Sequence, residues 1–542
     1  MTKKAIVHVE NTDNLVEFAR YLVSSDWTIL SANKTQEFLE KEKIPVIKES
    51  ALVENNQYYI ETCNLVQDVL NTKLPVEDSP VESESPNIFL VCMNLVPTYK
   101  KLNSEQEILK SQKPINYFHS ILIKNAVYNF ENVLVVTDPE DYKEVLIQLR
   151  IGKIKSDFRY YLAAKALNML SAYENGLAFS ILNGKFYNEH FMKYFGAPYK
   201  KYMNLKHGAN KQQKASVYSF LENGRHDQIK IEKIQGKEFT FTIIEDLSFA
   251  WEQISFLFTK LKNQMVVKSK NCDGYEFTTH FTPLLGTVFT IAVKNRIILG
   301  GALSSNVLDS FNKTLSYDTN LVKGAVIACS SVIDEDAAKE MVKGDFEAIV
   351  APAFTTEAKQ ILSANRNIRL IPSAQISVED IDLKLILGGL LIQTKESILF
   401  DKWHVKTKNR PSQYKIDEMA FGMMLVMNSK SYSVALIKEN AIVSLSQSCT
   451  SCVKAIKNAL IDAKELVERK SQSENFVNDG MIADIMVSDS PIPFCDATRE
   501  LIENGVTAII QPGGTENDDE FIQYCDERGI VMIFTGMSHL TS

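Results

Sequence analysis

The chain has 542 residues, 45% of them hydrophobic and 23% charged, which is typical of a globular protein with about two to four domains. Its formal net charge of −8 provides no basic surface for nucleic acid, so we expect no nucleic-acid partner. The longest strongly apolar run, residues 383–392, is shorter than the roughly 20 residues of a membrane-spanning helix. Since the opening sequence does not resemble a signal peptide, we expect a cytoplasmic protein with no membrane partner.

The first part of the chain alternates between strand and helix patterns. Apolar runs predict strands, in chain order, at residues 5–10, 27–32, 44–49, 88–95 and 132–137. Amphipathic periodicity predicts helices at residues 14–25 and 35–43, after Pro139, and over residues 156–183. This order favours a parallel sheet with helical crossovers.

Two segments interrupt these patterns. Residues 71–87 are proline-rich and acidic, so we predict a mobile loop or insertion there. Residues 199–216, YKKYMNLKHGANKQQKAS, are polar and are predicted to be irregular. We place a domain boundary near residue 195.

The second part of the chain returns to the same alternation. Residues 347–374 read as strand, helix and strand, and residues 483–535 repeat the pattern. We therefore predict an α/β protein with domains at 1–195 and 196–542, the second long enough for two sub-domains.

Cysteine spacing gives little support for a metal or disulfide site. The eight cysteines are scattered, which is not a disulfide framework. Cys449 and Cys452 form one C-x-x-C pair, but no second pair or H-x-x-x-H lies nearby to complete a zinc site. We predict no metal site, and redox or metal chemistry at this pair is the least favoured interpretation.

The stretch VTAIIQPGGTENDDEFI, residues 506–522, reads as a strand, a tight turn and an acidic helix start. We predict Thr515 as the N-cap, with the Asp518 side chain reaching back to the N–H of the capping residue. An acidic first turn would repel a phosphate, so we interpret the turn as structural.

Longer stretches resemble one known family. DIMVSDSPIPFCDATRELIENGVTAIIQPGGTENDDEFIQYCDERGIVMIFTGMSHL is similar to the end of the bifunctional AICAR transformylase/IMP cyclohydrolase family of purine biosynthesis. The opening KKAIVHVENTDNLVEFARYLVSSDW, the segment LKHGANKQQKASVY and the segment GKEFTFTIIED resemble other parts of that family. The family patterns for the last two are LRYGENPHQKAAFY and GKELSYNNLLD.

The resemblance implies a fold and a reaction for each domain. It implies an amino-terminal cyclohydrolase domain of methylglyoxal-synthase-like fold, followed by a transformylase domain of two cytidine-deaminase-like units. It also implies a homodimer held mainly through the second domain. The ligand would be a purine nucleotide (AICAR, formyl-AICAR or IMP), and 10-formyltetrahydrofolate would be the co-substrate of an active enzyme.

The catalytic residues of this family are changed here. The transformylase uses a Lys-His pair in a motif like VKHANPCG, whereas this chain has VKNRIILG, with Lys294 retained and Asn295 in place of the histidine. An amide cannot carry a proton near pH 7, and the loss of a general base typically costs ~10²–10⁴-fold in rate. His207, which replaces a tyrosine in the LRYG-like motif, is the candidate substitute base.

Other residues remain as candidate substrate-binding groups. In the second domain they are Lys206, which replaces an arginine, the pair Lys430 and Ser431 from a KSNA-like motif, and the matching pair Ser488 and Asp489. In the first domain they are Ser31 and Lys34 from an STGGT-like motif, Asn94 from an NLYP-like motif, and Lys124, which replaces an arginine. His119 replaces a glycine of a GGP-like loop, where it would crowd a phosphate.

Two hypotheses follow from these substitutions. The first is a catalytically degenerate family member that binds a ligand or regulates an active homologue, in a homodimer or in a mixed dimer with that homologue. The second is an enzyme that keeps one activity through repositioned groups. The sequence leaves both open.

Overall fold

The computed structural model describes residues 3–49, 59–74, 87–95, 117–182, 191, 193–220, 231, 233–257, 266–280, 287–316, 322–372, 381–396, 398–471 and 481–541. The chain divides into two compact units, residues 1–203 with 217–229 and residues 204–216 with 230–542. Both units are α/β structures, which confirms the predicted fold class. Most of the loop predicted at residues 71–87 lies outside the described residues.

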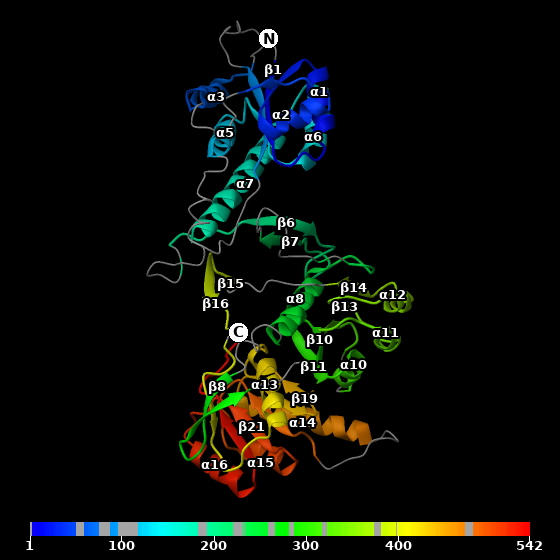
Figure 1. The fold of residues 1–542 in the computed structure, drawn as a ribbon, viewed down its shortest axis with the longest axis vertical. Coiled ribbons are helices and arrows are strands. Elements are labelled where there is room, and N and C mark those ends of the chain that lie inside the picture. The colour runs from blue at the N-terminus through cyan, green and yellow to red at the C-terminus, as the bar shows by residue number, and fades with distance from the viewer. Residues whose placement is uncertain are drawn as a thin grey trace. The chain divides into compact units, whose positions relative to one another are not determined.

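The first unit follows the predicted alternation of strand and helix (Figure 1). Its elements are β1 Lys3–Val9, α1 Leu15–Ser24, β2 Trp27–Ser31, α2 Asn33–Lys41, β3 Ile47–Lys48, α3 Tyr59–Asn71, β4 Ile88–Asn94, α5 Tyr117–Tyr128, β5 Leu134–Val136, the 3-10 turn Pro139–Asp141, α6 Tyr142–Ile151 and α7 Ser156–Leu182. All the predicted elements of residues 5–183 are present. Helices α3 and α5 were not predicted.

The sheet of the first unit is parallel, with strand order β3-β2-β1-β4-β5. Because side chains alternate along a strand, Ala5 and Val7 of β1 pack in one buried cluster with α1 and α6, while Ile6 packs in the other with α3, α5 and α7. The chain builds outward from β1 in both directions, so β1 and β4 flank the point where the strand order reverses. In open α/β sheets, ligands bind outside the carboxyl ends of the strands at that point.

The prediction of irregular structure for residues 199–216 was wrong at its start. Residues Tyr199–Asn204 form β6, which pairs with β7, Ser216–Phe220. The N–H of Leu205 donates to the carbonyl of Ala215 at 3.0 Å and extends this pairing. Most of β6 is exposed and polar, so it lacks the apolar alternation that identifies a strand from sequence.

In its described residues, the second unit contains a sheet of thirteen strands and a separate two-stranded hairpin. The helices are α8 Phe241–Ser255, α10 Val307–Leu315, α11 Glu335–Met341, α12 Thr356–Leu362, α13 Gln413–Met427, α14 Cys452–Ser471, α15 Asp496–Glu503 and α16 Asp518–Glu527. The strands are β8 Val266–Lys270, β9 Glu276–His280, β10 Val288–Lys294, β11 Ile297–Ser304, β12 Val326–Cys329, β13 Ala348–Ala351, β14 Arg369–Pro372, β15 Ile381–Ile386, β16 Gly389–Thr394, β17 Trp403–Val405, β18 Val434–Lys438, β19 Ala441–Ser446, β20 Ile485–Ser488, β21 Ala508–Gln511 and β22 Val531–Phe534.

An internal repeat accounts for most of the large sheet. The first repeat is α8, the antiparallel hairpin β10–β11, α10, and then the parallel strands β12, β13 and β14 joined by α11 and α12. The second repeat has the same order: α13, β18–β19, α14, and then β20, β21 and β22 joined by α15 and α16. The register shifts at the same place in both hairpins, between Ala292 and Val293 and between Leu436 and Ile437. The repeats meet where β11 pairs with β19, at Ala302 and Ala441.

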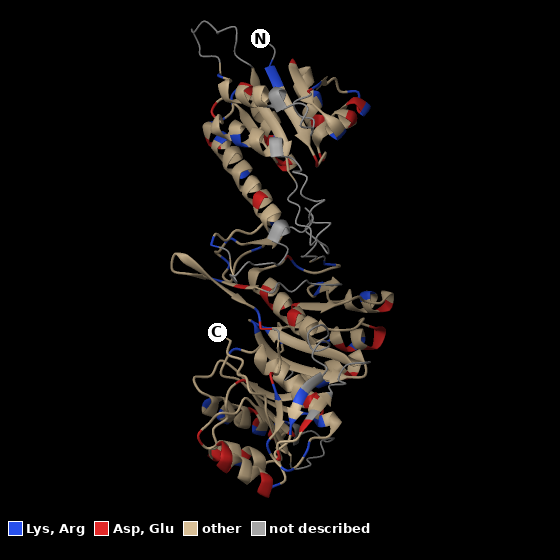
Figure 2. Cartoon of the chain, turned by 60° about the vertical axis from the view of Figure 1, so that its left-hand side comes forward, with Lys and Arg blue, Asp and Glu red and all other residues tan. Residues whose placement is uncertain are grey.

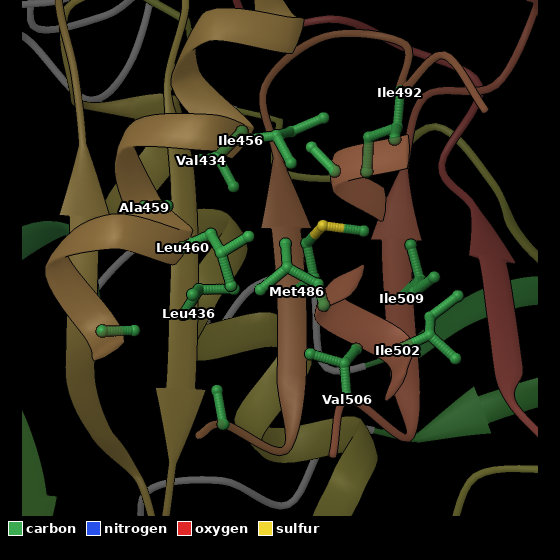
Figure 3. Close-up of a cluster of buried hydrophobic side chains, with 14 of the residues drawn as sticks. Val434, Leu436, Ile456, Ala459, Leu460, Met486, Ile492, Ile502, Val506 and Ile509 are labelled. Carbon is green, nitrogen blue, oxygen red and sulfur yellow. The ribbon is translucent and has the colours of Figure 1, made fainter. Parts of the chain in front are cut away.

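Each repeat buries its helices in the same way. In the second repeat, α14, α15 and α16 pack on one face of the strands, and Figure 3 shows Ile456 and Leu460 of α14 facing Leu436, Met486 and Ile509 of the sheet. The opposite face is covered by α13, whose residues 418–427 are all buried. Helices α10, α11 and α12 form the matching cluster in the first repeat. Burial of hydrophobic side chains on both faces of the sheet contributes most of the stability of such a layered structure.

The Pro-Gly-Gly turn after β21 is structural, but its cap differs from the prediction. Helix α16 begins at Asp518 with Asn517 in the N-cap position, so the assignment of Thr515 as N-cap was wrong. The Asp518 carboxylate accepts the N–H of Gly514 at 2.7 Å and also contacts the Thr515 hydroxyl. Gly513 has φ of 77°, and a side chain there would collide with Phe534. The turn amide is therefore already bound by a carboxylate of the same chain.

The apolar run at residues 383–392 forms the hairpin β15–β16, which is separate from the large sheet (Figure 1). None of the helices among the described residues is both long and apolar enough to cross a bilayer. In the view of Figure 2, Lys and Arg are interspersed with Asp and Glu over both units.

Candidate functional site

Lys294 and Asn295 lie at the tip of the β10–β11 hairpin. Asn295 and Arg296 form the two-residue turn, with φ of 54° and 59°. Positive φ at both positions is the type I′ geometry that suits the right-handed twist of a hairpin, and asparagine is among the residues that adopt it most readily. The position of the motif's histidine is thus occupied by a residue that favours the turn.

A buried carboxylate holds this turn in place. Asp246 of α8, only 5% exposed, accepts the N–H of Asn295 at 2.9 Å and the N–H of Arg296 at 2.6 Å. Burial raises the pKa of Asp246, and the two backbone hydrogen bonds act in the opposite direction. Sequence reasoning did not select Asp246, although it is the final residue of the segment GKEFTFTIIED and matches the aspartate of the similar family segment.

The Lys294 side chain has a partner within the same repeat. Its Nζ donates to the carbonyl of Lys323 at 2.8 Å, just before β12. Lys438 ends β18 in the second repeat, and its Nζ donates to the carbonyl of Met481 at 3.0 Å, before β20. The same lysine contact therefore occurs in both hairpins.

The carboxylate contact is also repeated. Glu418 is the sixth residue of α13, as Asp246 is of α8, and it accepts the N–H of Asn440 in the β18–β19 turn at 2.7 Å. The turn residues Glu439 and Asn440 have φ of 52° and 59°. Burial raises the pKa of Glu418, which is fully buried. Both hairpin tips are thus held by a buried acid and a lysine.

Three of the predicted binding residues of the second unit, Ser431, Ser488 and Asp489, lie in one polar cluster, and Lys430 lies beside it in the sequence. The Asp489 carboxylate accepts the N–H of Ser433 at 3.0 Å and its hydroxyl at 2.9 Å. Ser488 precedes it, and Ser431 donates its hydroxyl to the carbonyl of His539 at 3.2 Å. The carbonyl of Lys430 accepts the N–H of Ser448 at 2.7 Å, while the Lys430 side chain is exposed. Burial raises the pKa of Asp489, whose side chain is inaccessible to solvent.

A cavity of about 360 Å³ lies where β11 and β19 separate. It is lined by residues 297–299 of the Lys294 motif, by residues 445–448 of the segment that is glycine-rich in the family, and by Asn458, Ile461 and Asp462 of α14. The Gln447 amide donates to the carbonyl of Ile298 at 2.9 Å and so joins the two motifs. Sequence reasoning noted the loss of glycines in this segment but did not predict the cavity.

Lys206 and His207 lie beside the start of α8. The N–H of Lys206 donates to the carbonyl of Phe239, and the carbonyl of His207 accepts the N–H of Phe241. His207 is half-buried, with Nδ1 2.8 Å from the carbonyl of Gly208. That contact places the proton on Nδ1 and leaves Nε2 as the basic nitrogen. The Lys206 side chain is exposed.

Cys449 and Cys452 are free thiols in different surroundings. Cys449 Sγ lies 3.2 Å from Ser446 Oγ and 3.5 Å from Asn458 Nδ2, whereas Cys452 Sγ lies 3.6 Å from Ser488 Oγ. Burial raises the pKa of Cys452, which lowers the reactivity of its thiol. Within the described part of the chain, no group of three or more His, Cys, Asp or Glu side chains could hold a metal ion.

In the first unit, Asn94 and Ser31 lie at the carboxyl edge of the parallel sheet. Asn94 Oδ1 accepts the N–H of Glu10 at 2.7 Å and that of Asn11 at 3.1 Å, so it fixes the loop after β1. The Ser31 hydroxyl donates to the carbonyl of Val7 at 2.7 Å. Lys34 is exposed near the start of α2. Three of the four predicted residues of this unit therefore belong to strand ends or to the helix that follows.

Lys124 lies elsewhere, on α5, where its Nζ pairs with Glu174 of α7 at 2.6 Å. Two histidines that sequence reasoning did not treat as a pair meet near the strand-order reversal: His8 of β1 and His119 of α5, with ring centroids 4.3 Å apart. His119 is 2% exposed. Burial, followed by the charge of His119, lowers the pKa of His8 to about 3. The two imidazoles lie together beside β1.

Comparison with known proteins identifies the family. Residues 126–462, more than half of the chain, match the family model described as AICARFT/IMPCHase bienzyme. Proteins described as bifunctional purine biosynthesis protein PurH from Clostridium acetobutylicum and Brachyspira hyodysenteriae are each 28% identical, over 99% of this chain and 99% of the relative. The crystal structure of ForH matches 33% of this chain and 98% of its own at 23% identity, with a TM-score of 0.28, too low to add to the assignment. This chain therefore belongs to the AICARFT/IMPCHase bienzyme family, as the resemblance in its sequence predicts.

Proposed function

We propose that this chain is a purine-biosynthesis homologue with impaired or lost catalysis, which binds a purine nucleotide in the cytoplasm or regulates an active homologue. Residues 1–195 would correspond to the IMP cyclohydrolase domain, of methylglyoxal-synthase-like fold. Residues 196–542 would correspond to the AICAR transformylase domain. The internal repeat of the second unit supports two equivalent cytidine-deaminase-like sub-domains within it.

The observation that carries the proposal is the β10–β11 turn. Formyl transfer to an amine of low nucleophilicity needs a group that removes a proton, and the family supplies a histidine for this role. Here that position is Asn295, whose backbone is bound by Asp246 and whose side chain is exposed. An amide side chain does not accept a proton near neutral pH, so this position no longer supplies a base.

The retained lysine does not argue against this proposal. Lys294 donates to a backbone carbonyl just as Lys438 does in the second repeat, and Lys438 is not part of a Lys-His motif. A stabilising role in the hairpin is sufficient reason for this side chain to persist. Under this proposal, its presence reflects the fold rather than the chemistry.

Ligand binding is supported by the cavity between the two motifs. A volume of about 360 Å³ lies within the usual range for small-molecule sites, and Ser446, Gln447 and Asn458 provide polar groups along its wall. The side chains of residues 445–448 occupy positions that are glycine-rich in the family. We propose a purine nucleotide as the ligand, with 10-formyltetrahydrofolate as co-substrate only if the chain is active.

Steady-state assays test this proposal directly. Purified protein is given AICAR with 10-formyltetrahydrofolate, and separately formyl-AICAR with IMP formation monitored, beside a PurH from Clostridium acetobutylicum. We expect both turnover numbers to be at least ~100-fold lower than those of the relative, which is the low end of the cost of losing a general base. Calorimetric titration with AICAR and IMP then shows whether binding persists. Turnover comparable to that of the relative would refute the proposal.

A matched pair of variants separates the roles of the two lysines. Lys294→Met and Lys438→Met each remove one charged hydrogen bond to a carbonyl, so both should lower the free energy of unfolding by about 1 kcal/mol. Urea denaturation measures this loss. If Lys294 has only a structural role, any residual turnover changes equally in the two variants. A loss of turnover confined to Lys294→Met would instead favour an active site at the first hairpin.

One observation favours the second candidate function, an enzyme with repositioned groups. His207 has its proton on Nδ1, held by the Gly208 carbonyl, so Nε2 could accept a proton from a substrate amine. His207→Gln tests this candidate. If turnover is measurable in the parent protein, its loss in this variant, with unchanged unfolding in urea, would assign the base to His207.

The partner is proposed to be a second copy, or an active homologue in a mixed dimer. Because the two chains would share a fold, a mixed dimer would use the interface of the homodimer, with the degenerate chain on one side and the active chain on the other.

A further inference from the structure

The cavity between β11 and β19 has a lining that disfavours a phosphate. Among the described residues that line it, none is Lys, Arg or His, and its one charged side chain is the carboxylate of Asp462. The N–H of Ser448, in the loop that lines the cavity, already donates to the carbonyl of Lys430 at 2.7 Å. Proteins recognise phosphate with Arg, Lys or several backbone N–H groups, and a carboxylate repels it. The phosphate of a nucleotide therefore has no cationic partner in this lining.

The amide side chains of the wall use their N–H groups within the protein. Gln447 donates to the carbonyl of Ile298 at 2.9 Å. Asn458 Nδ2 lies 3.5 Å from Cys449 Sγ, and the Cys449 thiol donates to the carbonyl of Gln447 at 3.8 Å, so its sulfur accepts from Asn458. These contacts fix the orientation of both amides, with the nitrogen of each bound to the protein.

The amide oxygens of the same two residues are left as acceptors. Gln447 Oε1 and Asn458 Oδ1 make no hydrogen bond with the part of the chain that the structure describes. An amide oxygen accepts hydrogen bonds and donates none. An ionised phosphate also only accepts, so it cannot pair with these oxygens, whereas amino and carboxamide groups can. The wall therefore favours a ligand that carries several N–H donors.

Two exposed isoleucines give the cavity an apolar surface. Ile297 of β11 is 43% exposed and Ile461 of α14 is 54% exposed, and both line the cavity. A flat ring in contact with them removes apolar surface from water. The volume of about 360 Å³ is near the lower end of the range for small-molecule sites, which suits a ligand the size of a nucleoside.

We infer that this cavity receives the aminoimidazole carboxamide ring of AICAR and leaves the phosphate outside, so that the unphosphorylated nucleoside binds as well as the nucleotide. The amino and carboxamide groups of the ring supply the N–H donors, and its faces cover the isoleucines. The hypoxanthine ring of IMP lacks both groups and is the poorer fit. This inference rests on the proposed function and deepens it, because it says which part of the proposed nucleotide the cavity recognises.

Calorimetric titration of the wild-type protein tests the inference. Aminoimidazole carboxamide riboside and its monophosphate AICAR should have dissociation constants that agree within about threefold. Inosine should bind about tenfold more weakly than the riboside, a loss equivalent to about one hydrogen bond. A larger preference for AICAR over the riboside would overturn the inference while leaving nucleotide binding intact. If neither compound binds, the inference and the proposed ligand both fall, and the steady-state assays still decide separately whether catalysis is lost.

Variants of the wall show whether the riboside binds in this cavity. Asn458→Leu removes one acceptor at similar size and should weaken riboside binding about tenfold. The control Asn367→Leu makes the same exchange at an exposed position after α12 and should leave binding unchanged. Gln447→Met removes the other acceptor and replaces Asn458→Leu if urea denaturation shows that the latter is unfolded.

Two results with these proteins would contradict the inference. Riboside affinity that is unchanged in the folded cavity variants would place the ligand elsewhere. Tetrahydrofolate that displaces the riboside and binds more tightly than it does would assign the cavity to the pterin ring.

Discussion

The hairpins β10–β11 and β18–β19 hold equivalent positions in the two repeats, and each tip is fixed by a buried acid from the preceding helix. Asp246 binds both N–H groups of its turn, whereas Glu418 binds one. Lys294 and Lys438 both donate to a carbonyl ahead of the next strand. Only the first hairpin corresponds to the family's catalytic Lys-His motif. A lysine that belongs to a catalytic motif in the family thus makes the same structural contact as a lysine outside that motif.

Removal of the two acids should give the largest difference between the hairpins. Asp246→Ala deprives two N–H groups of a charged acceptor and should lower the free energy of unfolding of the second unit by about 2–3 kcal/mol. Glu418→Ala removes one such bond and should cost about 1–2 kcal/mol. Urea denaturation, with hydrogen exchange of the hairpin amides, measures both. Equal losses would show that the two tips are held with the same strength.

Lowering the pH should decrease the stability of the first unit but not the stability of the two hairpin tips in the second unit. The pKa of His8 is lowered from 6.5 to about 3 in the folded protein, so below pH 6.5 the unfolded chain binds a proton that the folded chain does not. The folded state therefore keeps its full stability above pH 6.5 and loses stability as the pH falls toward 3. Burial raises the pKa of Asp246 and Glu418, so their protonation in acid favours the folded state. Between pH 6.5 and 4.5, His8 should cost the first unit about 2 kcal/mol.

Hydrogen exchange at several pH values measures this loss in each unit separately. His8→Phe is the control, since it keeps the ring and removes the titrating group. On acidification, the first unit of this variant should lose less stability than the first unit of the wild type loses. An identical pH dependence in the two proteins would rule out His8 as the cause.

Exchange of the first turn residue between the hairpins should have the smallest effect. Glu439→Asn gives the second turn the residue of the first, and it should stabilise the protein by about 0.5 kcal/mol because asparagine tolerates positive φ better than glutamate. Asn295→Glu should destabilise it by about the same amount. Thermal denaturation of both variants and of the double swap would show opposite, additive shifts. Shifts of the same sign would mean that contacts of the side chains outweigh the turn geometry.

Much of the fold follows from local pattern. The five strands and the helices predicted for the first unit, and the alternation at 347–374 and 483–535, match the structure because buried strands and amphipathic helices carry their own periodicity. Strand β6 was missed because its side chains are mostly exposed, and its pairing with β7 supplies what periodicity could not. Thr515 was misassigned because α16 begins three residues later, at Asp518, whose carboxylate binds the turn instead.

The site was predictable only in part. Motif similarity selected Lys294, Lys430, Ser431, Ser488 and Asp489, and the structure brings the last three into one cluster. Nothing local could reveal that Asp246 binds a turn 49 residues away, or that Gln447 reaches Ile298. Such contacts depend on how strands distant in sequence are placed beside one another.

The sequence alone determined the α/β class and the family, and it predicts that Asn295 replaces a proton carrier, because these depend on residue identity and short-range periodicity. The tertiary structure decided that Lys294 is one of two equivalent hairpin lysines, that His8 meets His119, and that Leu385 of β15 is largely exposed. The physical reason is that burial, hydrogen-bond partners and open strand edges are properties of long-range packing, which residue order does not express locally.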